Sequence, residues 1–131
     1  MFTLEQIRDL QKKAEEKQWP YHYLFNSLKS IGIERYETNV LTHEIKYVGQ
    51  GSSLRMPAPE GFTPLIASTK FNLEALKLAL GRVQHRETTY GQFLAEIAAA
   101  GITFYRVDML PRTVTYHGPG REKYVEKVPE S

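Results

Sequence analysis

The chain has 131 residues, with 17 Lys and Arg against 15 Asp and Glu, four His and no Cys. This length predicts one domain over residues 1–131, and the lack of Cys excludes disulfides, thiol catalysis and Cys-ligated zinc sites. Basic charge is also not concentrated in one half, because residues 1–57 and 71–131 each contain eight Lys or Arg and seven Asp or Glu. Nucleic-acid-binding proteins gather basic charge on one face or segment, so we expect no nucleic-acid partner.

The sequence also predicts a cytoplasmic protein without a membrane partner. Residues 1–13 have an amphipathic helix pattern and lack the apolar run and cleavage site of a signal peptide. The most apolar stretch, from Phe93 to Tyr105, is short and contains Glu96, so we expect no membrane-spanning segment. The absence of Cys fits a reducing compartment.

Most of the chain is a sequence repeated once. Residues 2–51 and 71–120 align at an offset of 69 residues without a gap, and eleven of the fifty pairs are identical. Self-similarity at a fixed period is typical of a repeated supersecondary unit. We therefore divide the chain into a first repeat (2–57), a linker (58–70) and a second repeat (71–131), and predict a pseudo-twofold single domain. The shared landmarks are Phe2/Phe71, Tyr21/Tyr90, Gly32/Gly101, Tyr36/Tyr105, Tyr47/Tyr116 and Gly49/Gly118.

Each repeat is predicted to open with two helices. Thr3 as N-cap and Gln6 at the third helical position form a capping-box pattern, and apolar residues then recur at helical spacing. A second apolar stripe begins at Tyr21, and its counterpart begins at Tyr90. Gly32 and Gly101 follow these stripes, where a residue with positive φ commonly ends a helix.

Three strands are then predicted in each repeat. In the first repeat they span residues 34–40, 44–48 and 53–56, and in the second 105–109, 112–116 and 124–128. Gly118-Pro119-Gly120 predicts a tight turn with positive φ at its last Gly. The stretch from Pro57 to Lys70 contains three Pro and one Gly, and within it residues 63–68 are compatible with a short strand or a helical turn.

The predicted fold class is therefore α+β, an internal duplication of an ααβββ unit. Helices and strands come in runs rather than in alternation, which indicates antiparallel meanders. We expect the two sheets to meet or face each other across the pseudo-twofold axis, with the helices packed on one side.

A known family shares this pattern. The similarity rests on Gly32-Ile33, Tyr36, Tyr47 and Gly49 in the first repeat, and on Phe93-Leu94, Gly101, Tyr105-Arg106-Val107-Asp108, Thr113, Tyr116 and Gly118 in the second. The chain resembles the YbcV-like bacterial proteins of about this length, a family of unknown function in which some members carry the label phage envelope protein. The stretch Gln50-Gly51-Ser52-Ser53 departs from the Asn-Gly type of turn usual there. The resemblance implies a cytoplasmic α+β protein, with a phage-related origin suggested by that label, and no catalytic residues.

Several common kinds of site are not indicated. The Gly-x-Gly pairs follow strands but precede no helix, so hairpin turns are favoured over phosphate loops. The histidines, His22, His43, His85 and His117, lack metal-site spacing, and His43 and His85 are predicted to be exposed turn residues. No G-x-S-x-G motif is present. We predict no metal, no cofactor and no catalytic residues.

The two repeats differ in ways that point to one candidate ligand site. The differences lie at Glu37/Arg106, Asn39/Asp108, His43/Arg112 and Val48/His117, and they give the second hairpin a polar group that the first lacks. Strand alternation places Arg106 and Asp108 on one face, either as an ion pair or as ligand contacts. We expect any site to use Arg106, Asp108 and His117, with Tyr105 or Tyr116 as a wall.

The paired tyrosines leave two interpretations open. Tyr36, Tyr47, Tyr105 and Tyr116 either pack the repeats together or line an aromatic groove at the pseudo-twofold axis. For the whole chain we expect a protein that acts by binding a protein or small-molecule partner. The alternative is a small-molecule-binding domain or enzyme that uses the second hairpin. A homodimer is left open.

Overall fold

The computed structural model describes residues 2–130, which form four helices and six strands. The first repeat contains α1 (Leu4–Glu16), α2 (Tyr21–Ser30), β1 (Arg35–Asn39), β2 (Ile45–Gly49) and β3 (Ser52–Met56). The second contains α3 (Leu73–Gln84), α4 (Tyr90–Ala99), β4 (Phe104–Asp108), β5 (Thr113–His117) and β6 (Lys123–Lys127). Two helices followed by three strands thus occur twice, as the predicted ααβββ duplication requires.

All six strands belong to one antiparallel sheet with the order β3-β2-β1-β4-β5-β6. The two three-stranded meanders meet where β1 pairs with β4. The prediction that the two sheets meet or face each other is therefore resolved as one continuous sheet.

The pairing of β1 with β4 is symmetric about one pair of residues. Glu37 lies directly opposite Arg106, its own counterpart in the second repeat. Arg35 faces Asp108, and the counterparts of these two residues, Phe104 and Asn39, also face each other. A pseudo-twofold axis therefore crosses the sheet between Glu37 and Arg106.

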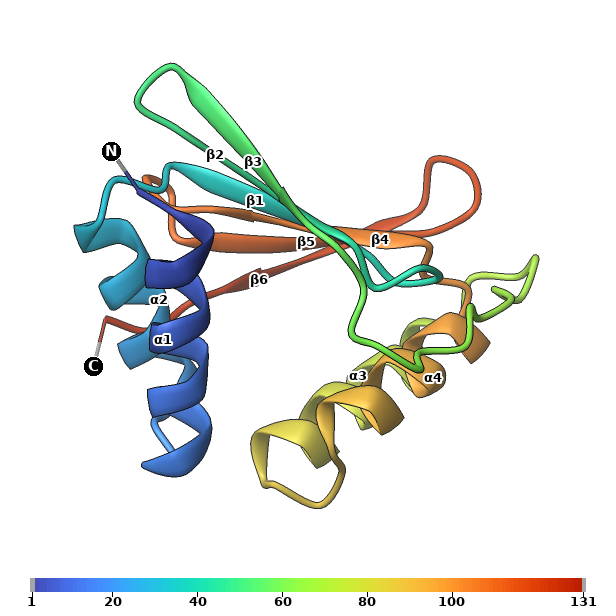
Figure 1. The fold of residues 1–131 in the computed structure, drawn as a ribbon. Helices are drawn as coiled ribbons and strands as arrows, with labels where there is room; N and C mark the ends of the chain where they lie inside the picture. The colour runs from blue at the N-terminus through green and yellow to red at the C-terminus, as the bar shows by residue number, and fades with distance from the viewer. Residues whose placement is uncertain (1, 131) are drawn as a thin grey trace.

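All four helices lie on one face of the sheet, as two separate pairs (Figure 1). The core fills the space between the helices and this face of the sheet. It includes fully buried side chains from α1, α2, α3 and α4, namely Ile7, Phe25, Leu76 and Leu94. Strand residues that point toward the helices alternate with polar residues that point away, as the period-2 pattern predicts. The α+β class with helices on one side is confirmed.

The observed caps at the ends of the helices agree with those predicted from the sequence. Thr3 and Thr89 each form a capping box with the Gln three residues later. Gly32 has φ of +104° and Gly101 has φ of +93°, as predicted. The amide of Ile33 donates to Leu28 O and that of Ile102 to Ile97 O, which closes both helices with the 6→1 hydrogen bond of the Schellman motif.

The loops differ from prediction in three places. Gly118 to Glu122 forms a five-residue loop between β5 and β6 rather than a tight turn, and Gly120 does not have positive φ. Its counterpart is a two-residue turn, in which Gln50 and Gly51 have φ of 54° and 72°, signs typical of a type I′ turn. Residues 63–68 form neither strand nor helix.

His43 is the third difference. It is half-buried rather than exposed, because its ring lies 5.0 Å from that of Phe62 and 5.3 Å from that of Tyr90. His85 is exposed, as predicted.

Over residues 2–130, none of the helices combines the length and the apolar character needed to cross a bilayer.

Candidate functional site

The face of the sheet turned away from the helices, called here the open face, is predominantly basic. Strand register places six basic side chains on it: Arg35, Lys46, Arg55, Arg106, Lys123 and Lys127. The acidic side chains of this face are Glu37, Asp108 and Glu44, the last just before β2. Basic charge that is evenly spread along the sequence is thus gathered in space, which the counts for the two halves did not reveal.

Arg106 lies at the centre of the open face between two carboxylates. Its Nε donates to Asp108 Oδ1 and Oδ2 at 3.0 and 3.1 Å, and its Nη1 lies 3.9 Å from Glu37 Oε1 across the strand pair. The predicted proximity of Arg106 and Asp108 is therefore found, in the form of an ion pair. This pairing holds the guanidinium in one place and leaves it less available for an anionic ligand.

His117 lies on the same face but contacts a different residue. Its ring stacks on Phe104, with centroids 4.3 Å apart and planes within 8° of parallel. Burial lowers the pKa of His117 below its ordinary value, Lys123 lowers it further, and Glu37 opposes the change. The imidazole is therefore neutral at neutral pH and offers one donor and one acceptor.

Tyr105 and Tyr116 lie on the opposite face of the sheet. Both are buried under the helices, with ring centroids 5.5 Å apart, and the hydroxyl of Tyr105 is hydrogen bonded to that of Tyr90. The structure therefore brings Arg106, Asp108 and His117 onto one face but separates them from the two tyrosines expected as a wall. The tyrosines form a different feature, described below.

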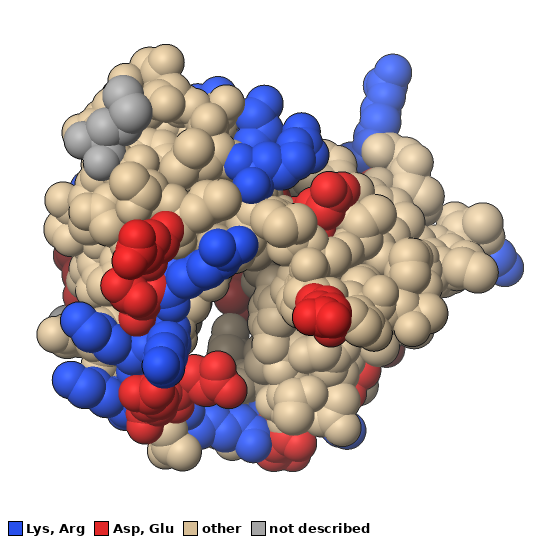
Figure 2. All heavy atoms as spheres, in the orientation of Figure 1, with Lys and Arg blue, Asp and Glu red and all other residues tan. Residues whose placement is uncertain are grey.

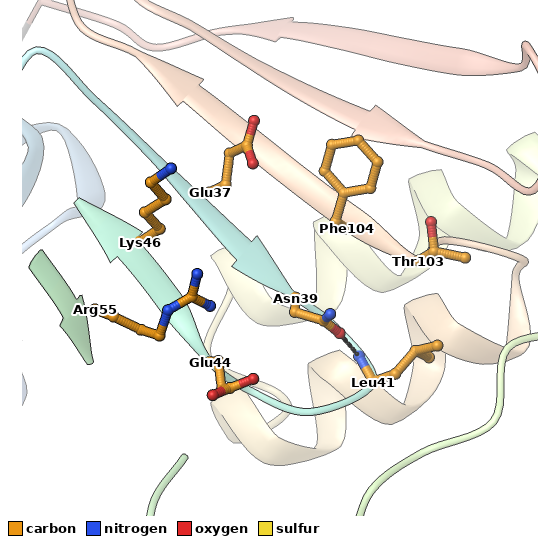
Figure 3. A pocket seen from close by; sticks show the side chains of 8 residues that line it. All are labelled: Glu37, Asn39, Leu41, Glu44, Lys46, Arg55, Thr103 and Phe104. Atoms are coloured by element: carbon orange, nitrogen blue, oxygen red, sulfur yellow. Dashed lines mark hydrogen bonds between the residues drawn. The ribbon is translucent and has the colours of Figure 1, made fainter. Parts of the chain in front are cut away.

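A depression of about 490 Å³ hollows the open face beside the pseudo-twofold axis (Figure 3). It shares Glu37 with the Arg106 cluster, and its Phe104 carries the stacked His117. The lining residues are Glu37, Asn39, Leu41, Glu44, Lys46, Arg55, Thr103 and Phe104. Most of them come from the first repeat, so a comparison that favoured the second hairpin missed them.

Two cations of this depression lie side by side. Lys46 is directly opposite Arg55 on the neighbouring strand, with Glu37 on its other side. Among residues 2–130, no carboxylate lies within 4.0 Å of Lys46 or Arg55 in an ion pair. Because like charges directly opposite each other destabilise a sheet, this pair favours a bound anion. The polar alternation of residues 44–48 and 52–56 is visible in the sequence, but the register that joins the two cations is not.

The site is not arranged to hold a metal. Over the part of the chain that the structure describes, no group of three or more His, Cys, Asp or Glu is placed to share an ion. The hydrogen-bond donors around the depression are the ammonium, guanidinium, amide and hydroxyl groups of Lys46, Arg55, Asn39 and Thr103, which suit an organic ligand.

Comparison with known proteins gives a family but no activity. Residues 9–126 match a family model described as protein of unknown function (DUF1398). A search of curated proteins found no match.

Proposed function

We propose that this chain, which belongs to the DUF1398 family of proteins of unknown function, is a binding protein for a small anionic molecule. The ligand binds in the depression on the open face. The observation that carries this proposal is the in-register pair of Lys46 and Arg55, which line the depression without an ion-pair partner among the described residues.

The chemistry of the lining suggests what kind of anion fits. Arg55 can bind a carboxylate or phosphate through two parallel hydrogen bonds, and Lys46 adds a point charge. Phe104 offers an apolar surface, and Asn39 and Thr103 offer neutral polar groups. A volume of about 490 Å³ falls in the usual range for small-molecule sites.

The acidic residues restrict the ligand further. Glu37 and Glu44 line the same depression as the two cations. These carboxylates would repel a dense polyanion. A molecule with one anionic group and several hydroxyl or amino donors could instead bind the two cations through its anionic group and the carboxylates through its donors. The class favoured is therefore a small polar acid or monophosphate ester.

The proposal is tested by thermal-shift measurement with a panel of carboxylic acids and phosphate monoesters, followed by calorimetry of any compound that stabilises. A ligand present at 100 times its Kd should add about 2.7 kcal/mol to the free energy of unfolding. Lys46→Ala and Arg55→Ala should each abolish most of this effect. Lys127→Ala, on the same face but on the edge strand β6, is the matched control and should retain it.

The result that would overturn the proposal is a panel with no stabilising anion, or stabilisation that survives both substitutions. The neighbouring cluster is tested by the same assay. Stabilisation that is lost in Arg106→Ala but kept in Arg55→Ala would move the site to Arg106, Asp108 and His117, as for the alternative of an enzyme or ligand-binding domain on the second hairpin.

Location, origin and assembly belong to the same proposal. We place the protein in the cytoplasm and treat a prophage origin as implied by the resemblance to YbcV-like proteins. Cell fractionation and the position of the gene relative to integrated phage genes test these two points. Light scattering separates a monomer from a homodimer, and a pull-down tests for a protein partner.

A further inference from the structure

The face of the sheet under the helices contains a second, independent cleft at the pseudo-twofold axis. The two helix pairs lie side by side on this face (Figure 1), and a hollow separates the two parts of the molecule in the space-filling view (Figure 2). At the far ends of the pairs, Arg86 Nη2 donates to Gln18 O at 2.5 Å, which bridges the loop after α1 and the loop after α3.

Six tyrosines, three from each repeat, surround this space, which we call the tyrosine cleft. The hydroxyls of Tyr21 and Tyr36 share a hydrogen bond of 2.5 Å, and those of Tyr90 and Tyr105 share one of the same length. The remaining two are Tyr47 and Tyr116, whose rings lie 5.3 Å from Tyr36 and 5.5 Å from Tyr105. The arrangement in one repeat is thus reproduced in the other.

Tyr21 and Tyr90 form the accessible walls of the cleft. Their side chains are 42% and 39% exposed, whereas the tyrosines of the sheet are almost fully buried. Their hydroxyls nevertheless point inward, because each is hydrogen bonded to the hydroxyl of a buried tyrosine of the sheet.

The electrostatics of the cleft disfavour negative charge. Burial raises the pKa of Tyr36, Tyr47, Tyr105 and Tyr116 as well, so all six hydroxyls stay protonated at neutral pH. Glu126, on the helix-facing side of β6, adds to the rise at Tyr21 and Tyr116. It accepts a hydrogen bond of 3.2 Å from Gln84 on α3. Burial is the largest cause of each rise and disfavours charge of either sign, whereas the carboxylate of Glu126 disfavours a negative charge and favours a positive one.

One polar group at the base of the cleft lacks a well-formed partner. Thr38 is fully buried in β1, opposite Tyr105, and its Oγ1 makes no hydrogen bond of acceptable geometry among the described residues. The hydroxyl is close enough to the hydroxyls of Tyr90 and Tyr105 to oppose the rise in the pKa of both. A group buried in this way is available to a ligand that reaches the floor of the cleft.

We propose that the tyrosine cleft binds a small organic cation, an alkylammonium or quaternary ammonium group. The faces of tyrosine rings attract such cations, the hydroxyl oxygens of Tyr21, Tyr90 and Thr38 accept hydrogen bonds from N–H groups, and Glu126 supplies a carboxylate. The site lies on the opposite face of the sheet from the anion site and does not depend on it.

The test uses choline, tetramethylammonium and ethanolammonium, with 3,3-dimethylbutan-1-ol as the uncharged analogue of choline. Binding to the full chain is measured by calorimetry and by tyrosine fluorescence. Saturable binding of at least one cation is expected, with the alcohol weaker by roughly tenfold. Equal binding of choline and the alcohol, or no saturable binding by any of the cations, overturns the proposal.

Substitutions in the partly exposed walls locate the site without emptying the core. Tyr21→Ala and Tyr90→Ala should each weaken the cation by roughly tenfold, and Glu126→Gln should weaken it as well. Tyr23→Ala is the matched control, because Tyr23 is an exposed tyrosine of the same helix that packs on Trp19 instead. Tyr21→Phe keeps the ring and should retain most of the affinity for tetramethylammonium. Binding that is unaffected by Tyr21→Ala and Tyr90→Ala, or lost equally in Tyr23→Ala, contradicts the assignment.

Discussion

At the scale of single residues, the two glycines that end α2 and α4 are not equivalent. A Cβ at Gly101 would lie 2.5 Å from the backbone oxygen of Lys70, which cannot easily move. The three atoms nearest to a Cβ at Gly32 all belong to the side chain of Gln50, the closest at 2.6 Å, and that side chain can turn away. Both positions also require positive φ, which costs an L-residue about 1 kcal/mol or more.

We therefore expect Gly101→Ala to destabilise the protein more than Gly32→Ala, and both by about 1 kcal/mol or more in urea unfolding. Gly81→Ala is the control, because Gly81 lies inside α3 with no atom within 4 Å of the added Cβ. It should stabilise the protein by roughly 0.5–1 kcal/mol. An equal loss at positions 32 and 101 would mean that strain in φ, rather than the contact with Lys70, sets the cost.

His43 gives a prediction about pH. Its ring is packed against Phe62 and Tyr90, and burial lowers its pKa below the ordinary value. The unfolded chain therefore takes up a proton at higher pH than the folded one. The contribution of neutral His43 to the free energy of unfolding should be fully present above about pH 6.5 and should be lost as the pH drops below that value.

His43→Asn tests this origin, because Asn also tolerates the positive φ of this position. Urea midpoints measured from about pH 7.5 to about pH 5.5 should decline less steeply in this variant than in the wild type. His85→Asn, at an exposed site, should leave the decline unchanged. A part of the decline should remain in His43→Asn, because burial also lowers the pKa of His117.

At the scale of helices and strands, the two tyrosine pairs fasten each second helix to the sheet. Tyr21 begins α2 and bonds to Tyr36 in β1, and Tyr90 begins α4 and bonds to Tyr105 in β4. Tyr21→Phe and Tyr90→Phe should each lower the free energy of unfolding by about 1 kcal/mol, since each leaves one buried hydroxyl unpaired. Tyr23→Phe, at an exposed site, should have almost no effect. Unchanged stability in Tyr21→Phe would show that Tyr36 finds another partner.

The sequence predicted helices and strands well because local signals coincide with the tertiary structure. The capping pattern at Thr3 and the helix-ending Gly32 and Gly101 act within one turn of the chain, and strand bounds agree to within two residues. The loop after β5 was predicted wrongly, because the amide of Gly118 bonds to Glu122 O and Glu122 Oε1 accepts from the amide of Gly120. Those contacts depend on a residue outside the Gly-Pro-Gly stretch.

At the scale of the whole molecule, the sequence predicted a repeat but not how its two copies meet. Pairing of β1 with β4 is non-local, and it places Arg106 in one row with Glu37 and Lys46, which the pairing of β1 with β2 already brings together. The placement of the polar side chains was therefore predicted in part: Arg106 and Asp108 are adjacent, as strand alternation requires, but Lys46 and Arg55 were overlooked. Tyr105 was assigned to the same site although alternation places it on the other face. Superposition of residues 2–51 on 71–120 remains a prediction for the duplication.

The symmetric register has a consequence for self-recognition. A residue on a twofold axis faces its own copy, so a dimer of two first repeats would place Glu37 against Glu37, and a dimer of two second repeats Arg106 against Arg106. Only unlike halves place opposite charges there, as the fused chain does. Segments 1–70 and 71–131, produced separately and mixed, should therefore form a mixed pair in preference to either homodimer, and Arg106→Glu should abolish that preference. The charge difference at the axis thus favours the pairing of unlike halves over the pairing of two identical halves.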